Sequence, residues 1–397
     1  LRQRRKGDVL VPVRHPGDEG VSEVTPRTGG LLRVVSGAAL VLLLPLAGAA
    51  AAGRPLAPYL QFPPKTPIAQ HAPFSLPVFA GLALLVLLLT APNFLPLILH
   101  RGEAVSRKPG RPFPWWGWTG LGAGGAAWVL AWGRFPWMEG LQAHTFTPLW
   151  VAYIAVVNAF TFRRTGRCLF LARPRRFLLL FPASAAYWWT FEYLNRFVGN
   201  WYYLGVRGFG AGEYFLFASL PFSTVLPAVL STRELLLSFP RIEEPFREWR
   251  PLSPRKPRSA GGAALLLGCA ALFVVGIVPD AVFPLVWVAP PLILISLAAL
   301  RGERNVLSGI AAGDWRLLVV SSLAALCCGF FWEMWNAGSF AKWVYQLPYI
   351  EAFHLFEMPL LGYAGYLPFG VLCAEVGDPV LDAGPSEKFS SLPRQLR

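Results

Sequence analysis

Charged residues are scarce in this chain of 397 residues. They make up 15% of it, whereas hydrophobic residues make up 54%, and the mean hydropathy is +0.45. A water-soluble globular protein carries about one-quarter charged residues, so that class is excluded. Several apolar runs reach the roughly 20 residues that a helix needs to cross the hydrocarbon layer. The composition therefore predicts an all-α polytopic membrane protein, with the lipid bilayer as its first partner.

Motifs for metal, nucleotide or thiol chemistry are also missing. The five cysteines form no CxxC pair, and the sequence has neither an HxxxH nor an HExxH pair. It contains no phosphate-cradling glycine loop and no serine nucleophile elbow. His71, His144 and His354 are too scattered to indicate a metal site. We therefore expect no metal and no cofactor.

About ten helices account for the apolar segments. Proline and glycine inside such helices are tolerated, because neighbouring helices can satisfy the freed backbone groups. The expected helices cover 31–52, 76–99, 115–133, 147–162, 177–195, 213–231, 260–278, 283–300, 317–336 and 352–374.

The net charge of +14 follows the expected topology. If the N-terminus is cytoplasmic, most of the 36 lysines and arginines fall in cytoplasmic segments, as the positive-inside rule requires. The basicity then needs no nucleic acid as a partner. The pattern predicts a multi-pass protein of the inner (cytoplasmic) membrane with both termini in the cytoplasm. Residues 31–52 also resemble a signal peptide, but we favour an uncleaved first helix.

Two similar three-helix units follow an N-terminal part. In each unit a helix runs inward, a second returns with [FW]-E-x-[LW]-N at its outer end, and an aromatic loop leads to a third helix opened by E-x7-P. Parallel repeats of this kind place a shared site between the two halves. The expected organisation is a disordered basic tail 1–30, a three-helix scaffold 31–133, unit one 147–231, a basic linker 232–259, a connector helix 260–278, unit two 283–374 and a cytoplasmic tail 375–397.

The two units contain the only acidic residues expected within helices. A carboxylate at membrane depth costs several kcal/mol unless it is neutral, paired or hydrated, so it indicates function. Desolvation would keep it protonated, as general-acid chemistry requires. Glu192 and Glu333 are the predicted proton-handling pair. Their predicted catalytic partners are Glu213, Glu351 and Glu357. The predicted substrate-binding residues are Trp189, Asn195, Trp201, Tyr203, Trp332, Asn336, Trp343, Tyr345 and His354.

Structural interpretations remain open for several of these residues. Glu213 and Glu351 would favour helix N-termini for electrostatic reasons alone. An interfacial aromatic belt would place the tryptophans and tyrosines at the same depth. Asn195 and Asn336 follow Glu192 and Glu333 by three residues, and buried asparagines also form interhelical hydrogen bonds.

The acid-to-tryptophan spacing, Glu192 to Trp201, and the following Glu213-x7-Pro221-Phe222 resemble the lycopene cyclase domain of bacteria, archaea and fungi. The similarity covers roughly 147–231 and 283–374, under half of the chain. Glu192 stands where that family has aspartate, and a single Glu213 stands where it has a pair of glutamates. The resemblance implies a two-unit membrane fold that protonates one end of a linear carotenoid and closes a ring without redox change.

The resulting hypothesis is a membrane enzyme, an isomerase similar to lycopene cyclases, that acts on a carotenoid or other isoprenoid lipid by acid/base catalysis. A proton-coupled carrier fits parallel repeats and intramembrane acids as well. A non-enzymatic structural membrane protein is the third alternative. The sequence leaves the substrate and the oligomeric state open.

Overall fold

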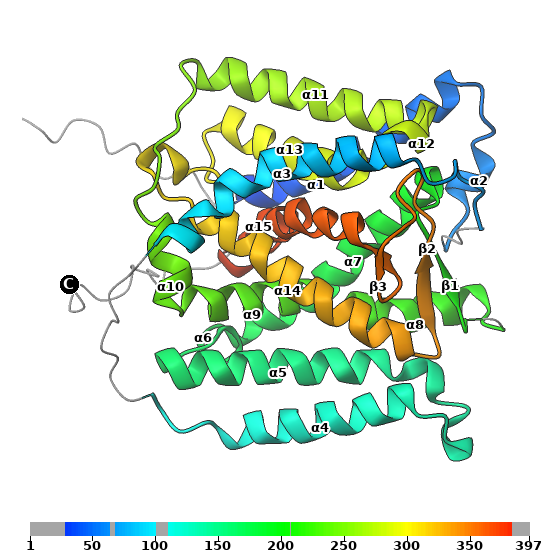
Figure 1. Cartoon of the computed structure of the whole chain (residues 1–397), viewed down its shortest axis with the longest axis vertical. Helices are drawn as coiled ribbons and strands as arrows, with labels where there is room; N and C mark the ends of the chain where they lie inside the picture. Colours follow the sequence, from blue (N-terminus) through cyan, green and yellow to red (C-terminus); the bar gives the residue numbers. More distant parts are fainter. Residues whose placement is uncertain (1–27, 64–67, 101–109, 207, 383–397) are drawn as a thin grey trace, which may run out of the picture.

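The computed structural model describes residues 28–63, 68–100, 110–206 and 208–382. The expected tail 1–30 lies almost wholly outside them, as do residues 383–397. Helices dominate the described chain (Figure 1). The long ones are α1 (Thr28–Ala51), α3 (Leu76–Leu99), α4 (Trp115–Trp132), α5 (Phe146–Thr165), α7 (Pro174–Val198), α8 (Ala211–Phe222), α9 (Val225–Leu237), α11 (Pro257–Ile277), α13 (Leu285–Arg301), α14 (Arg316–Gly338) and α15 (Tyr366–Asp382). Short helical turns are α2 (Ala57–Leu60), α6 (Leu169–Ala172), α10 (Pro240–Glu243) and α12 (Pro279–Val282).

The fold is that of an all-α polytopic membrane protein. In the described chain, seven helical segments are long and apolar enough to cross a membrane. They are α1 from Gly30, α3, α5 with the turn before it, α8 with α9, α11, α14 and α15 with the turn before it. The expected helices α4, α7 and α13 are also present and pack beside members of this set.

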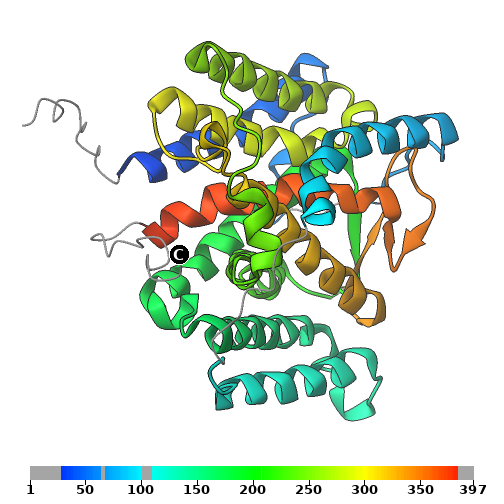
Figure 2. The same cartoon turned by 60° about the vertical axis from the view of Figure 1, so that its left-hand side comes forward.

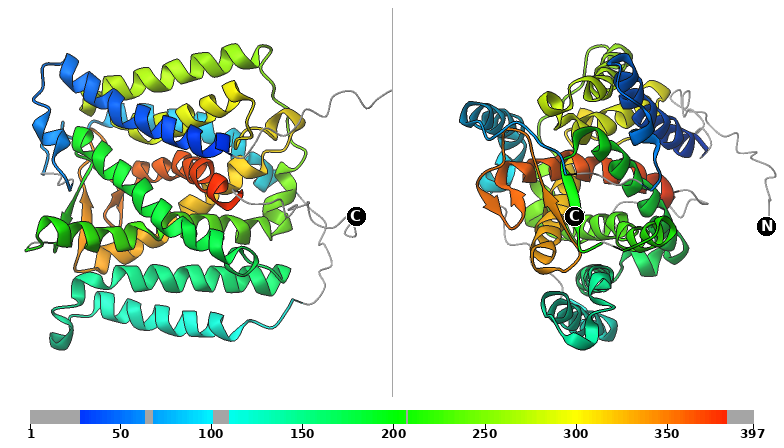
Figure 3. Two further views of the ribbon diagram at one scale, coloured as in Figure 1. Left: turned by 180° about the vertical axis from the view of Figure 1, so that it is seen from behind. Right: turned by 90° about the vertical axis from the view of Figure 1, so that its right-hand side faces the viewer.

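The helices lie side by side with their ends at two opposite faces (Figure 1). α1, α11 and α13 pack together, α4 packs on α5, and α7, α9, α14 and α15 form the centre. Figure 2 and the two views of Figure 3 show the same grouping from other sides. α3 contacts the body mainly near its ends, at Glu244–Phe246 and at Leu360–Gly365. The first three expected helices are therefore distributed over the molecule.

Small residues set the closest helix contact. A Cβ atom added to Gly48 of α1 would lie 1.9 Å from the carbonyl oxygen of Phe273 in α11, and one added to Gly276 would lie 2.1 Å from that of Pro45. Only glycine permits this approach, which maximises van der Waals packing where lipid removes the hydrophobic driving force. The two glycines fix the α1–α11 pair.

The aromatic loops of the two units form a two-stranded ribbon. β1 (Trp201–Leu204) pairs antiparallel with β2 (Lys342–Tyr345). Trp201 lies opposite Tyr345, and Tyr203 lies opposite Trp343. Gly199 makes the ribbon possible, because α7 ends there in a left-handed conformation (φ 60°) that glycine adopts without steric cost.

Two expected helices differ from the structure. The helix expected at 213–231 is divided into α8 and α9 at Ser223 and Thr224. The helix expected at 352–374 is wrong in its first half, which forms a hairpin of β3 (His354–Leu355) and β4 (Met358–Pro359) and a 3-10 turn at Leu360–Gly365. Its second half begins at Tyr366 and continues to Asp382, into the segment expected as a tail.

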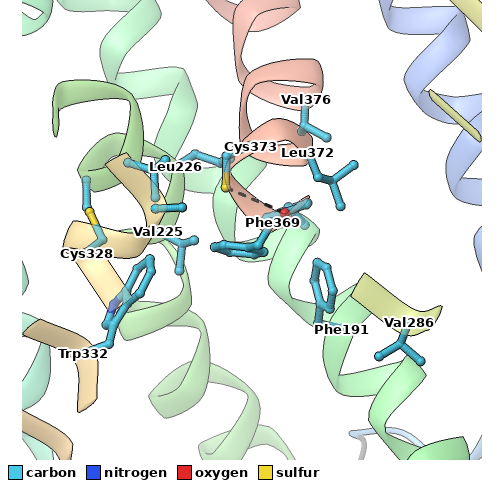
Figure 4. Packing of buried hydrophobic residues seen from close by; sticks show 14 of the residues in the cluster. Phe191, Val225, Leu226, Val286, Cys328, Trp332, Phe369, Leu372, Cys373 and Val376 are labelled. Atoms are coloured by element: carbon cyan, nitrogen blue, oxygen red, sulfur yellow. Dashed lines mark hydrogen bonds between the residues drawn. The ribbon is translucent and has the colours of Figure 1, made fainter. Parts of the chain in front are cut away.

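The central core lies between α7, α9, α13, α14 and α15. Phe369 of α15 lies among Phe191, Val225 and Trp332, which come from three other helices (Figure 4). The Phe369 ring centroid is 5.7 Å from that of Phe191 and 6.1 Å from that of Trp332. This packed layer holds α7 and α14, which carry the two central glutamates, at a fixed separation.

Carboxylates at the far end of α15 bind arginines from three other segments. Asp378 accepts two hydrogen bonds from Arg233 of α9, at 2.6 and 2.9 Å. Glu375 pairs with Arg33 of α1 at 3.2 Å. Asp382 pairs with Arg173, just before α7, at 3.0 Å. These ion pairs join α15 to α1, α7 and α9 at the face opposite the ribbon.

Candidate functional site

Glu192 is a buried hydrogen-bond acceptor among aromatic side chains. It lies in the last turns of α7 and is 1% exposed. Its Oε1 accepts a 2.6 Å bond from the Tyr203 hydroxyl, a 3.0 Å bond from Trp188 Nε1 and a 3.2 Å bond from Trp201 Nε1. The ribbon strand thus folds back over the helix that precedes it and covers the carboxyl group.

Glu333 occupies a corresponding environment in α14. It is 0% exposed, and its Oε1 accepts hydroxyl hydrogen bonds from Tyr345 at 2.8 Å and from Tyr366 at 2.6 Å. Trp343 Nε1 donates to the Tyr345 hydroxyl at 2.8 Å. Glu333 Oε2 is buried and has no hydrogen-bond partner in the described part of the chain. That oxygen is free to carry a proton.

The two asparagines have a shared structural task. Asn195 Nδ2 donates to the Trp201 carbonyl at 2.7 Å, and its Oδ1 accepts from the Trp201 amide at 3.3 Å. Asn336 makes the same two bonds with Trp343, at 2.8 and 2.9 Å. The structure therefore places these side chains on the ribbon backbone, where they hold each loop tryptophan over its glutamate. Neither asparagine lines the cavity between the ribbon and α3. Their bonds to the ribbon also do not join one helix to another.

A cavity of about 680 Å³ is lined by residues of both ribbon strands and by residues from 147–231 and from 283–374. Its wall includes five of the residues predicted to bind substrate, which are Trp201, Tyr203, Trp332, Trp343 and Tyr345. Glu192 and Glu333 lie behind this wall and reach the cavity through the tyrosines that they bind. α3 closes the opposite side with Leu82, Val86, Leu89 and Thr90.

The two ribbon tyrosines are neutral hydrogen-bond donors. Burial, with the neighbouring Glu192, raises the pKa of the Tyr203 hydroxyl well above its usual value of 10.0. Burial and Glu333 do the same to the pKa of Tyr345. Each hydroxyl therefore keeps its proton and connects a buried carboxyl group to the cavity.

The other three predicted acids bind groups other than Glu192 and Glu333. Glu213 lies in the first turn of α8 and accepts a 2.9 Å bond from the Gly210 backbone amide, which is a capping contact. Glu351 starts no helix, because it lies in a loop, where it binds the Leu347 amide and His354 Nε2. Glu357 is not in a helix either, since it lies in the β3–β4 turn and pairs with Lys342 at 2.6 Å.

Two more of the predicted substrate-binding residues, besides Asn195 and Asn336, lie outside the cavity wall. Trp189 Nε1 donates to Ser219 Oγ at 2.9 Å, and its ring stacks on Phe215. His354 is exposed and binds Glu351 at 2.8 Å. In the described ranges, no group of three or more His, Cys, Asp or Glu side chains is arranged to hold a metal ion.

Three site residues were missing from the predicted set. Trp188 precedes Glu192 by four residues, so helical spacing alone could have placed it on the same face. Tyr366 donates to Glu333 from α15, 33 positions away. Trp287 of α13 lines the cavity and lies 5.8 Å from the Trp201 ring. Neither of the latter two has a local sequence signal, because tertiary packing brings them in.

No protein family, curated protein or solved structure matches the chain.

Proposed function

We propose that this chain is an integral membrane enzyme, similar in type to lycopene cyclases, that acts on a carotenoid or other isoprenoid lipid by acid/base catalysis. One observation supports this most directly. Glu192 binds Tyr203 at 2.6 Å and Glu333 binds Tyr345 at 2.8 Å, and both tyrosines line one apolar cavity. Buried proton carriers thus face a space suited to a water-insoluble substrate.

We also propose that the two units are an internal parallel repeat. Glu192, Asn195, Trp201 and Tyr203 make contacts that Glu333, Asn336, Trp343 and Tyr345 repeat. Across the ribbon, the tryptophan of each unit lies opposite the tyrosine of the other. A twofold relation between the units would produce this reciprocal register. The site then belongs to both units, at their interface.

The proposed reaction moves one proton in and one proton out. A protonated carboxyl group passes its proton to the tyrosine oxygen, while the tyrosine hydroxyl proton adds to one carbon of the substrate's terminal double bond and leaves the positive charge on the other carbon. The resulting cation accepts the π electrons of a double bond farther along the chain, and a carbon–carbon bond closes the ring. Loss of a ring proton to the second tyrosine–carboxylate pair restores a neutral product. The product is an isomer of the substrate, and no redox change occurs.

The walls of the cavity suit a cationic intermediate. Trp201 and Trp287 lie 5.8 Å apart, and Trp332 stacks on Tyr366 at 6.0 Å. A cation over such a face gains about 2 kcal/mol when both are desolvated. The aromatic groups therefore supply electrostatic stabilisation where positive charge would develop.

The size of the cavity fits one end of a long substrate. Its volume of about 680 Å³ falls within the roughly 300–1,000 Å³ of small-molecule sites. α3 separates this space from the surrounding lipid with apolar side chains. One end of an isoprenoid would occupy the cavity while the rest extends toward the bilayer.

The proposed location is the inner (cytoplasmic) membrane with both termini in the cytoplasm. The first residues of α1 and the last of α15 lie at the same face of the molecule as α6 and α10, and the ribbon lies at the other (Figure 1). Arg163, Arg164, Arg173 and Arg247 belong to segments near the first face. The positive-inside rule would place that face in the cytoplasm.

A carrier for ions or polar solutes is the weaker alternative. The glutamate oxygens are covered by Trp and Tyr side chains, and the cavity wall in front of them is mainly apolar. An ion path needs water or polar groups along it.

Expression in a bacterial host that accumulates linear carotenoids tests the proposal. The extracted pigments, separated by chromatography, should include a cyclic isomer of the same mass that an empty-vector host lacks. The same pigments in both hosts, with the protein folded in the membrane, would count against a carotenoid substrate. The assay would then be repeated with shorter isoprenoids, and inactivity on those as well would refute the proposed class.

A further inference from the structure

Asn200 is a buried polar residue that the proposed chemistry does not use. It lies between Gly199, where α7 ends, and Trp201, the first residue of β1. Its exposed fraction is 1%, and it contributes to the wall of the cavity. Its backbone carbonyl oxygen accepts a 2.8 Å bond from the backbone amide of Gln346, so the two residues extend the ribbon by one pair.

The side-chain amide of Asn200 has no partner for either of its polar atoms. Among the described residues, neither Nδ2 nor Oδ1 makes a hydrogen bond. Gln346, directly across the ribbon, likewise has a buried Oε1 without a partner. A buried amide left in this state costs about 1–3 kcal/mol, and the large majority of buried polar groups in folded proteins are bonded.

Four other polar side chains at the cavity wall are already paired. The Thr90 hydroxyl donates to the Val86 carbonyl at 2.7 Å, and Lys342 pairs with Glu357 at 2.6 Å. Tyr203 and Tyr345 are bonded to the glutamates. His144 and Thr147 also line the cavity, but His144 is exposed and Thr147 is half-buried. Asn200 differs from both, because its unpaired donor and acceptor are buried in the mainly apolar wall.

We propose that Asn200 recognises an oxygen group on the substrate, so that the natural ligand is an isoprenoid carrying a hydroxyl rather than a pure hydrocarbon. A hydroxyl can accept a hydrogen bond from Nδ2 and donate one to Oδ1, which completes both halves of the amide. A hydrocarbon in the same position would leave both atoms unpaired. A site with buried polar groups discriminates strongly against an analogue that lacks the matching group. The inference rests on the proposed isoprenoid site and narrows its substrate class.

Binding of two matched probes tests the inference. The purified full chain in detergent is titrated with a C20 isoprenoid alcohol and with the hydrocarbon of the same skeleton, and quenching of tryptophan fluorescence reports occupancy. The measured quantity is the ratio of the two affinities, compared between the wild type and Asn200→Leu. The comparison between proteins cancels the difference in detergent partition of the probes. The wild type should prefer the alcohol over the hydrocarbon about tenfold more strongly than Asn200→Leu does. This factor corresponds to a difference in binding free energy of about 1.4 kcal/mol.

Thr90→Val provides the matched control. It removes another polar group from the wall, but one that is already bonded within its own helix, so the affinity ratio should stay that of the wild type. Equal ratios in the wild type and Asn200→Leu would overturn the inference. A tenfold loss of preference in Thr90→Val as well would also overturn it, because the effect would then be one of general wall polarity.

Thermal unfolding without ligand gives a second readout. Removing an unpaired buried amide should leave the melting temperature of Asn200→Leu unchanged or raised. A clear decrease would mean that the amide is bonded in the free protein, which would contradict the inference. Both readouts are independent of turnover. A wild type that prefers the alcohol but forms no cyclic product would refute the acid catalysis and leave the role of Asn200 intact.

Discussion

Trp201 lies opposite Tyr345 across the ribbon that joins the two units. The Trp201 indole binds Glu192 at 3.2 Å, whereas the Tyr345 hydroxyl binds Glu333 at 2.8 Å. One cross-strand pair therefore connects two buried acids that are more than 100 residues apart in the sequence. The pair also lines the cavity, so both acids are bonded to side chains of the same wall.

Removal of the Tyr203 hydroxyl should separate Glu192 from the cavity. Tyr203→Phe keeps the ring and its packing but loses the 2.6 Å bond to Glu192. If the hydroxyl carries the proton, kcat should fall about 10²-fold while the protein stays folded. Tyr202→Phe is the control, since neighbouring strand residues point to opposite faces. Equal kcat for Tyr203→Phe and the wild type, measured by product formation in detergent, would exclude a role for this hydroxyl.

The Asn336 side chain should stabilise the folded protein, because it holds the ribbon backbone at Trp343. Asn336→Ala removes two bonds to the Trp343 backbone and leaves a buried amide and carbonyl unpaired. The free energy of unfolding should fall by about 2 kcal/mol, as measured by denaturant titration in mixed micelles. Asn93→Ala is the matched variant, because the Asn93 side chain donates to the Leu89 carbonyl one turn back in its own helix, the partly exposed α3. Similar losses in both variants would argue against the ribbon-anchoring role.

Asp378 should contribute strongly to the joining of α9 and α15. Asp378→Ala would leave Arg233, which is 5% exposed, without its closest carboxylate. Arg233 would keep only its longer contact with Glu234, at 3.9 Å, and removing the bonded partner of a buried charge costs about 3 kcal/mol. Asp382→Ala removes a carboxylate from the same helix whose side chain is 73% exposed, so it should cost less than about 1 kcal/mol. Melting temperatures that fall equally would show that burial of the pair is unimportant.

Acid should weaken the network at the start of α14. Burial opposes the charge on Asp314, but hydrogen bonds from the Arg316 side chain and backbone outweigh it and hold the pKa of Asp314 below its usual 3.8. Since the folded-state pKa is the lower one, the ionised carboxylate stabilises the fold above about pH 4, and this contribution is lost as the pH falls through the folded value. Arg316 also pairs with Glu243 in the same network.

The variant Asp314→Asn isolates this contribution. Melting temperatures measured from neutral pH down to about pH 3 should fall more steeply for the wild type than for the variant. The two curves should converge at the acidic end. Parallel curves over the whole range would show that Asp314 has the same pKa in the folded and unfolded chain.

The long apolar helices were predictable because length and composition decide them. α3 has the bounds that its leucine-rich run predicts, 76–99. The stretch around Glu357 reads as helical by the same measure, but the structure forms a hairpin there. Tyr349, Phe353 and Phe356 adopt left-handed backbone conformations in this loop, with φ of 65°, 56° and 58°. Non-glycine residues adopt such angles only where tertiary contacts enforce them, and composition carries no sign of those contacts.

The burial of the two central glutamates was predictable, whereas most of their hydrogen-bond partners were not. A carboxyl group inside an apolar helix is conspicuous, and Glu192 and Glu333 are both buried. The ribbon was not predicted, because two four-residue strands from distant loops leave no periodic pattern to read. The roles of Asn195 and Asn336 follow from that ribbon, and Tyr366 reaches Glu333 only through the packing of α14 against α15. These features depend on contacts between segments far apart in the chain, and a single sequence gives no local pattern that identifies such contacts.

Turnover by glutamine variants is the most direct test of the central claim, which is that the two buried glutamates handle the substrate's proton. Product formation from a linear isoprenoid is compared for the wild type, Glu192→Gln, Glu333→Gln and the exposed-residue control Glu139→Gln, all verified as folded. We predict that each of the first two substitutions lowers kcat about 10³-fold or more, while the control retains wild-type activity. Wild-type rates in both Glu192→Gln and Glu333→Gln would contradict the account.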